Sequence, residues 1–104
     1  MQQVLTIVAL PKSGIEANAV FFAKYFDTAR ARLTGAGVTS LVIVMPPAGS
    51  DHDDWRRSLA RDLARDHAPQ RVNIVGGAGD HIEPTLAYLG NAPGVTGQYI
   101  ALHE

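Results

Sequence analysis

The segment Leu41-Val42-Ile43-Val44-Met45, followed by Pro46-Pro47-Ala48-Gly49, decides the fold. A run of consecutive apolar residues, rich in β-branched side chains and without polar alternation, is typical of a strand that is covered on both faces. The prolines have no amide hydrogen to donate to a sheet, so the strand must end there. Ligands of open α/β sheets bind beyond the carboxyl ends of the strands. We therefore expect a central strand at residues 41–45 and a candidate ligand site directly after it.

Further strands and helices alternate along the chain on both sides of this segment. Apolar runs predict strands at residues 4–10, 72–75 and 98–102. Helical spacing of apolar residues predicts helices at residues 14–33, 51–67 and 80–89. This alternation, with right-handed crossovers, predicts four parallel strands in the spatial order 1-2-3-4. The fold class is thus α/β: a half-Rossmann domain with three helices, in two or three layers, formed by the single domain 1–104.

The helix expected at residues 14–33 is more apolar than one buried face requires. Ser13 and Glu16 form a capping-box pattern at its start, because each side chain can satisfy an orphan amide. Val20, Phe21 and Tyr25 widen the apolar arc beyond the stripe that should face the sheet, so this helix needs a second partner surface. The predicted stripe consists of Ile15, Ala19, Phe22, Phe26, Ala29 and Leu33.

Composition narrows the classes of function. The net charge is −1, which gives no electrostatic attraction to nucleic acid. Cysteine is absent, which excludes disulfides and thiolate chemistry. The start of the chain lacks the basic segment of a secretion signal, and no apolar run approaches the roughly 18 residues of a membrane span. We expect a cytoplasmic protein without nucleic-acid or membrane partners.

Two segments that follow predicted strands are candidate ligand sites. Asp51-His52-Asp53-Asp54, with His81, offers ligands suited to Zn or Mn, but acids at the start of a helix also complement its dipole. Gly76-Gly77-Ala78-Gly79 could hold a phosphate, but Asp80 would repel an anion and glycines also serve turns. The cap and the turn are the favoured interpretations, so no metal and no cofactor is predicted.

Several segments carry a family resemblance. The segment 86–98, Leu-Ala-Tyr-Leu-Gly-Asn-Ala-Pro-Gly-Val-Thr-Gly-Gln, is similar to the helix, loop and Val-Thr-Gly-Gln signature of the short-chain dehydrogenase/reductase family. Residues 71–75 resemble its Arg-Val-Asn-x-Val strand, and residues 57–64 resemble the preceding helix. Asn18, with the following residues to Phe22, resembles the start of the family's long interface helix. The likeness is to the second half of the family's fold.

The departures from the family concern its chemistry. No TGxxxGxG phosphate turn occurs, and Met45 and Pro46 stand where the resemblance places a catalytic serine. No tyrosine is followed four residues later by lysine, so the family's general acid has no counterpart. Gly77 and Ala78 replace the Pro-Gly turn that the family places under nicotinamide. The resemblance therefore implies a truncated, non-catalytic relative without catalytic or cofactor-binding residues.

Two hypotheses on function follow. The first is association: the family dimerises through the helices that match 14–33 and 51–67, so we expect a homodimer, or an accessory subunit of a full-length relative, with interface residues Phe21, Tyr25, Phe26, Trp55 and Leu59. The second is a small binding module or enzyme at the carboxyl edge, with the candidate residues Asn18, Pro46, His52, Gly77 and His81, and with Asp51, Asp54 and Asp80 as further polar groups. A third alternative is oxidoreductase activity that appears only when a partner chain completes the fold.

Overall fold

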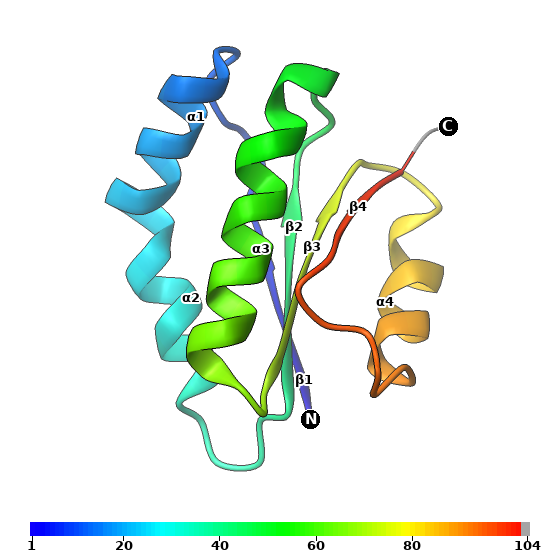
Figure 1. The fold of residues 1–104 in the computed structure, drawn as a ribbon. Helices are drawn as coiled ribbons and strands as arrows, with labels where there is room; N and C mark the ends of the chain where they lie inside the picture. The colour runs from blue at the N-terminus through cyan, green and yellow to red at the C-terminus, as the bar shows by residue number, and fades with distance from the viewer. Residues whose placement is uncertain (103–104) are drawn as a thin grey trace.

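The computed structural model of the protein describes residues 1–102 and contains one parallel sheet. Within these residues the sheet has four strands in the order β1-β2-β3-β4, and all neighbouring pairs are parallel (Figure 1). The strands are β1 (Gln2–Thr6), β2 (Ser40–Met45), β3 (Arg71–Gly76) and β4 (Tyr99–Ala101). The predicted α/β class and the predicted strand order are confirmed.

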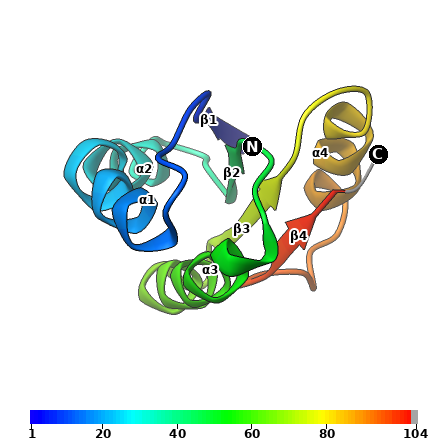
Figure 2. The same ribbon diagram turned by 90° about the horizontal axis from the view of Figure 1, so that it is seen from above.

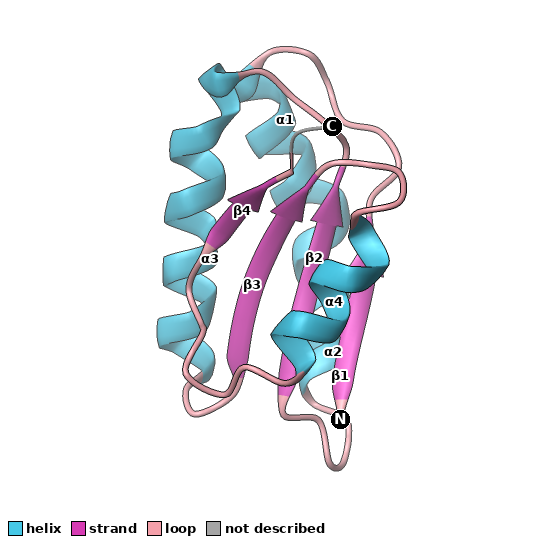
Figure 3. Ribbon diagram, turned by 90° about the vertical axis from the view of Figure 1, so that its right-hand side faces the viewer, coloured by secondary structure: helices cyan, strands magenta, loops and turns pink. Residues whose placement is uncertain are grey.

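The helices form one layer on each face of this sheet. With the sheet itself, the domain therefore has three layers. One layer holds α1 (Gly14–Val20), the π-helical segment η1 (Phe21–Tyr25), α2 (Phe26–Leu33), the 3₁₀ turn η2 (Ser50–His52) and α3 (Asp53–His67). The other layer holds α4 (Ile82–Gly90). Figures 2 and 3 show α4 alone on one face and the remaining helices on the opposite face. Among residues 1–102, none of these helices combines the length and the apolarity that crossing a membrane requires.

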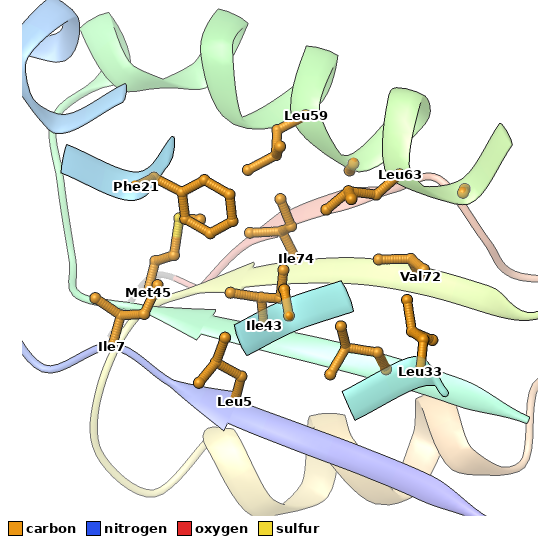
Figure 4. Packing of buried hydrophobic residues seen from close by; sticks show 14 of the residues in the cluster. Leu5, Ile7, Phe21, Leu33, Ile43, Met45, Leu59, Leu63, Val72 and Ile74 are labelled. Atoms are coloured by element: carbon orange, nitrogen blue, oxygen red, sulfur yellow. The ribbon is translucent and has the colours of Figure 1, made fainter. Parts of the chain in front are cut away.

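Buried hydrophobic residues form two clusters, one on each face of the sheet, and β2 contributes side chains to both. Leu41, Ile43 and Met45 pack into the larger cluster, toward α1 to α3, as Figure 4 shows for Ile43 and Met45. Val42 and Val44 point the other way and pack in the cluster that Leu89 of α4 completes. All β2 residues are buried, so the absence of polar alternation in this segment reflects cover on both faces.

Several predicted boundaries are shifted. The first strand, expected at residues 4–10, runs from Gln2 to Thr6, because β2 ends at Met45 and offers no partner further along. Ile7 still donates its amide to Val44, whereas Val8 is 84% exposed. The last helix begins at Ile82 rather than at residue 80, and no side chain caps its start. The last strand spans residues 99–101, although the amide of residue 102 still reaches the oxygen of residue 76.

The predicted core stripe of helix 14–33 is wrong at three positions, Ile15, Ala19 and Phe22, which are exposed. Ile15 is 85% exposed and Phe22 is 50% exposed, whereas Phe21 is fully buried near Met45 (Figure 4). One line of buried or half-buried residues instead recurs every four positions: Ala17, Phe21, Tyr25, Ala29 and Leu33. In an α-helix, a step of four residues rotates the side chain about 40° past one full turn. A π-helical turn holds an extra residue and rotates the stripe back, so η1 keeps this stripe on the sheet.

The family-like motifs near the carboxyl end have a structural role. Asn73 of β3 donates its side-chain amide to the oxygen of Val95 at 3.0 Å and accepts the amide of Gln98 at 3.1 Å. The Thr96 hydroxyl accepts the amide of Val72 at 3.0 Å. Asn73 is 2% exposed, so these bonds satisfy a buried amide and also fix the loop before β4.

The position of the two adjacent phenylalanines can be tested by truncation. Phe21→Ala should destabilise the chain by about 3–5 kcal/mol, because it opens a cavity in the core. Phe22→Ala should lower the free energy of unfolding by about 1 kcal/mol or less, because that side chain is half-exposed. Urea unfolding of both variants measures the difference. Equal losses, or a greater loss for Phe22→Ala, would contradict the register described above.

Candidate functional site

The carboxyl ends of the strands carry a hollow of about 440 Å³. The parallel strands all point to the same edge of the sheet, and the loops that follow β1 and β2 lie at that edge (Figure 3). Apolar residues form much of its lining, and polar or charged side chains form the rest. The lining residues are Leu10, Pro11, Lys12, Pro46, Pro47, Ala48, Gly49, Asp51, His52 and Arg56.

His52 is buried in the wall of this hollow, where both of its ring nitrogens are bonded. The indole nitrogen of Trp55 donates to Nδ1 at 3.0 Å. Nδ1 is therefore the acceptor, so Nε2 carries the hydrogen and donates to the backbone oxygen of Lys12 at 2.8 Å. The side chain is 4% exposed. His52 thus ties the loop after β1 to the start of α3 and has no free nitrogen for a metal.

Arg56 is the functional candidate that the sequence analysis missed. Its residue is 0% exposed, and Nη1 donates to the hydroxyl of Tyr99 at 3.2 Å. Nε has no hydrogen-bond partner, and none of the ion pairs among residues 1–102 includes Arg56. The guanidinium lies 5.6 Å from the ring centroids of both Trp55 and Tyr99. A buried charge with so few partners is unusual in a folded protein.

Gly76 explains how this arginine enters the core. A Cβ atom on Gly76 would lie 2.7 Å from Nη1 of Arg56 and would also meet the hydroxyl of Tyr99. Glycine at the end of β3 therefore lets the two side chains approach the backbone this closely, and a larger residue would require them to shift. The pattern of charged and apolar residues along this helix predicts Arg56 on its solvent-exposed face and Trp55 on its buried face. The signal that could have predicted the burial of Arg56 is its helical spacing, because Leu59, Ala60 and Leu63 follow it on the same face of α3.

The other predicted edge residues are dispersed. Pro46 and His52 line the hollow together. Gly77 lines a neighbouring hollow of about 270 Å³ and shares a third hollow, of about 260 Å³, with Pro46, whereas His81 is exposed and lines none of the three. Asn18 lies in a groove between α1 and α3, next to Trp55. Within residues 1–102, no group of three histidine or acidic side chains is placed to hold a metal ion.

Two predicted interface residues are core residues instead. Phe21 is 0% and Leu59 is 5% exposed, so neither side chain is available to another chain. Tyr25, Phe26 and Trp55 are half-buried and pack against the core from its margin. Among residues 1–102, the large apolar side chains that are exposed on this layer are those of Ile15 and Phe22, which the sequence pattern predicts in the core.

Fold and site together define a parallel α/β domain of the Rossmann-like class, with a hollow at the carboxyl edge of its sheet. A family model described as SDR-like, short chain dehydrogenase-like protein, matches residues 5–102, and the chain belongs to this family. Neither a curated protein nor a solved structure matches the chain. The resemblance inferred from the sequence is therefore confirmed at the level of the family.

The dinucleotide cofactor that the family implies does not fit the residues present. A dinucleotide needs a glycine-rich turn whose amides face the pyrophosphate. After β2 the chain has Pro46 and Pro47, and neither proline has a backbone N–H to donate to a pyrophosphate. After β3, a Cβ on Gly77 would lie only 2.9 Å from that of Leu102, so the chain itself fills the space beside this glycine. The exposed Asp80 follows and would repel a phosphate.

The His52–Trp55 pair can be tested with a double-mutant cycle. Trp55→Phe should destabilise the chain by about 1–3 kcal/mol, because it leaves a buried ring nitrogen without its donor. In a His52→Leu background the same change should cost clearly less, since the acceptor is already gone. Urea unfolding of the four proteins gives the coupling energy. A coupling energy of zero would show that this hydrogen bond does not hold the wall of the hollow.

Proposed function

We propose that this short chain dehydrogenase-like chain acts by association with a second copy of itself, through the outer surface of α1 and α3, rather than by dehydrogenase chemistry of its own. The observation that carries this proposal is a groove between the two helices that is bordered by exposed apolar side chains. The same two helices form the dimer in the enzymes that the chain resembles.

The groove has two connected parts. Its first part, of about 530 Å³, is lined by Ser13, Gly14, Ile15, Asn18, Asp51, Asp54 and Trp55. Its second part, of about 240 Å³, is lined by Asn18, Phe22, Trp55, Ser58, Leu59 and Asp62. Asn18 and Trp55 belong to both parts, so the groove is continuous along the two helices. Its length along both helices favours a helical partner over a small ligand.

Exposed apolar side chains border this groove on the α1 side. Ile15 is 85% exposed and Phe22 is 50% exposed, and the ring of Phe22 contacts Phe21 and Phe26 with centroid separations of 5.6 and 5.1 Å. Phe21 in turn lies 6.5 Å from Trp55 of α3. The exposed side chains therefore rest on a rigid aromatic base, which suits a surface that packs against another chain. A two-fold dimer would use this surface on both copies.

Sedimentation velocity tests the proposal. The unmodified chain should sediment as a dimer, and Phe22→Asp and Ile15→Asp should each shift it to a monomer, because a carboxylate would be buried at the interface. Both side chains are exposed enough for the fold to survive, which circular dichroism can verify. Tyr88→Asp is the matched control, since Tyr88 is 59% exposed on α4 in the other layer, and it should leave the dimer intact.

A monomer at every accessible concentration of the unmodified chain would overturn self-association. A dimer that persists in both Phe22→Asp and Ile15→Asp would overturn this choice of surface.

A further inference from the structure

We propose that the hollow at the carboxyl ends of β1 and β2 binds a small organic carboxylate, whose oxygens pair with the buried guanidinium of Arg56. This hollow shares the lining residue Asp51 with the groove between α1 and α3, but the inference rests on Arg56, which lines the hollow and not the groove, and it does not depend on the proposed association.

The inference rests on the buried positive charge of Arg56, which has no negatively charged partner among residues 1–102. A guanidinium removed from water needs an opposite charge or a full set of hydrogen-bond acceptors. Among residues 1–102 its only hydrogen-bond partner is the neutral hydroxyl of Tyr99, and Nε has none. The rings of Trp55 and Tyr99 offer a weak attraction at 5.6 Å from their centroids, which does not replace a carboxylate. An anionic ligand would supply the missing partner.

The surroundings of Arg56 favour an anion with an apolar body. Arg56 lines the hollow together with Leu10, Pro46 and Pro47, whose side chains offer no hydrogen bonds to a ligand. A volume of about 440 Å³ is within the range of small-molecule sites. Shielding from bulk water strengthens a charge-assisted hydrogen bond, and the planar guanidinium matches the two oxygens of a carboxylate.

The remaining charges of the hollow are one cation and one acid. Lys12 is exposed, and the oxygen of its backbone is held by Nε2 of His52 at 2.8 Å, so its loop is fixed beside the hollow. Asp51 is the single acid among the lining residues; its side chain is 68% exposed and lies 3.8 Å from Nε2 of His52. In the net charge of the lining, Lys12 and Asp51 cancel. One uncompensated positive charge remains, which a monoanionic carboxylate matches better than a phosphate dianion.

Calorimetric titration with sodium butyrate tests the site, with sodium acetate and inorganic phosphate at equal ionic strength for comparison. Butyrate should bind saturably. Acetate should bind several-fold more weakly, because it lacks the body that contacts the prolines, and phosphate should also bind more weakly. Arg56→Met should weaken butyrate binding at least tenfold. Arg57→Met is the matched control, because Arg57 is the next residue of α3, is 58% exposed and pairs with Asp53 and Asp54; it should bind as the unmodified chain does.

A spectroscopic measurement on the unmodified chain guards against misfolding of Arg56→Met. Butyrate should shift the Nε–H resonance of Arg56 in a ¹⁵N spectrum, with the same saturation as the calorimetric signal. The proposal would be overturned by no saturable binding, by unchanged binding in a folded Arg56→Met, or by an unmoved Arg56 resonance. Tighter binding of phosphate than of butyrate would overturn the assignment to a carboxylate, and equal binding of acetate would overturn the role of the apolar wall.

Discussion

The burial of β2 on both faces is the constraint on which the rest of the structure depends. Leu41, Ile43 and Met45 require the layer of α1 to α3, while Val42 and Val44 require α4 on the opposite face. Parallel strands with helices on both sides bring all strand-to-helix loops of the sheet to its carboxyl edge. The hollow therefore forms where β2 ends, at Pro46. The outer surface of the larger helical layer is left to face water or a partner.

The sequence predicts those features that depend on local composition. Apolar runs bounded by proline and glycine gave the strands, and their alternation with helices gave the correct strand order. The register of helix 14–33 could not be predicted in this way. The π-helical turn η1 exchanges the roles of Phe21 and Phe22, and both residues have the same hydrophobicity. Only packing against the sheet decides which of them is buried.

Arg56 illustrates a second limit of sequence reasoning. An arginine on an amphipathic helix rich in charged residues is predicted to be exposed to solvent. The helical spacing that contradicts this prediction competes with the stronger hydrophobicity of Trp55. In its buried position it packs beside Gly76 and the ring of Tyr99. These residues lie on two different strands, so the pocket is a property of the tertiary structure. His52 was predicted at the edge, but its bonds to Lys12 and Trp55 give it a structural role there.

The family motifs of this chain support architecture more than chemistry. Asn73 and the Val-Thr-Gly-Gln segment hold the last strand in place, whereas the prolines after β2 and the turn after β3, beside which Leu102 lies, do not offer the amides that a pyrophosphate needs. Association through α1 and α3 is then the central functional claim. Recording ¹⁵N–¹H correlation spectra over a dilution series tests it most directly. We expect concentration-dependent shifts for amides along the groove, around Ile15, Phe22 and Trp55, with α4 unchanged. Spectra that do not depend on concentration, or shifts confined to α4, would contradict it.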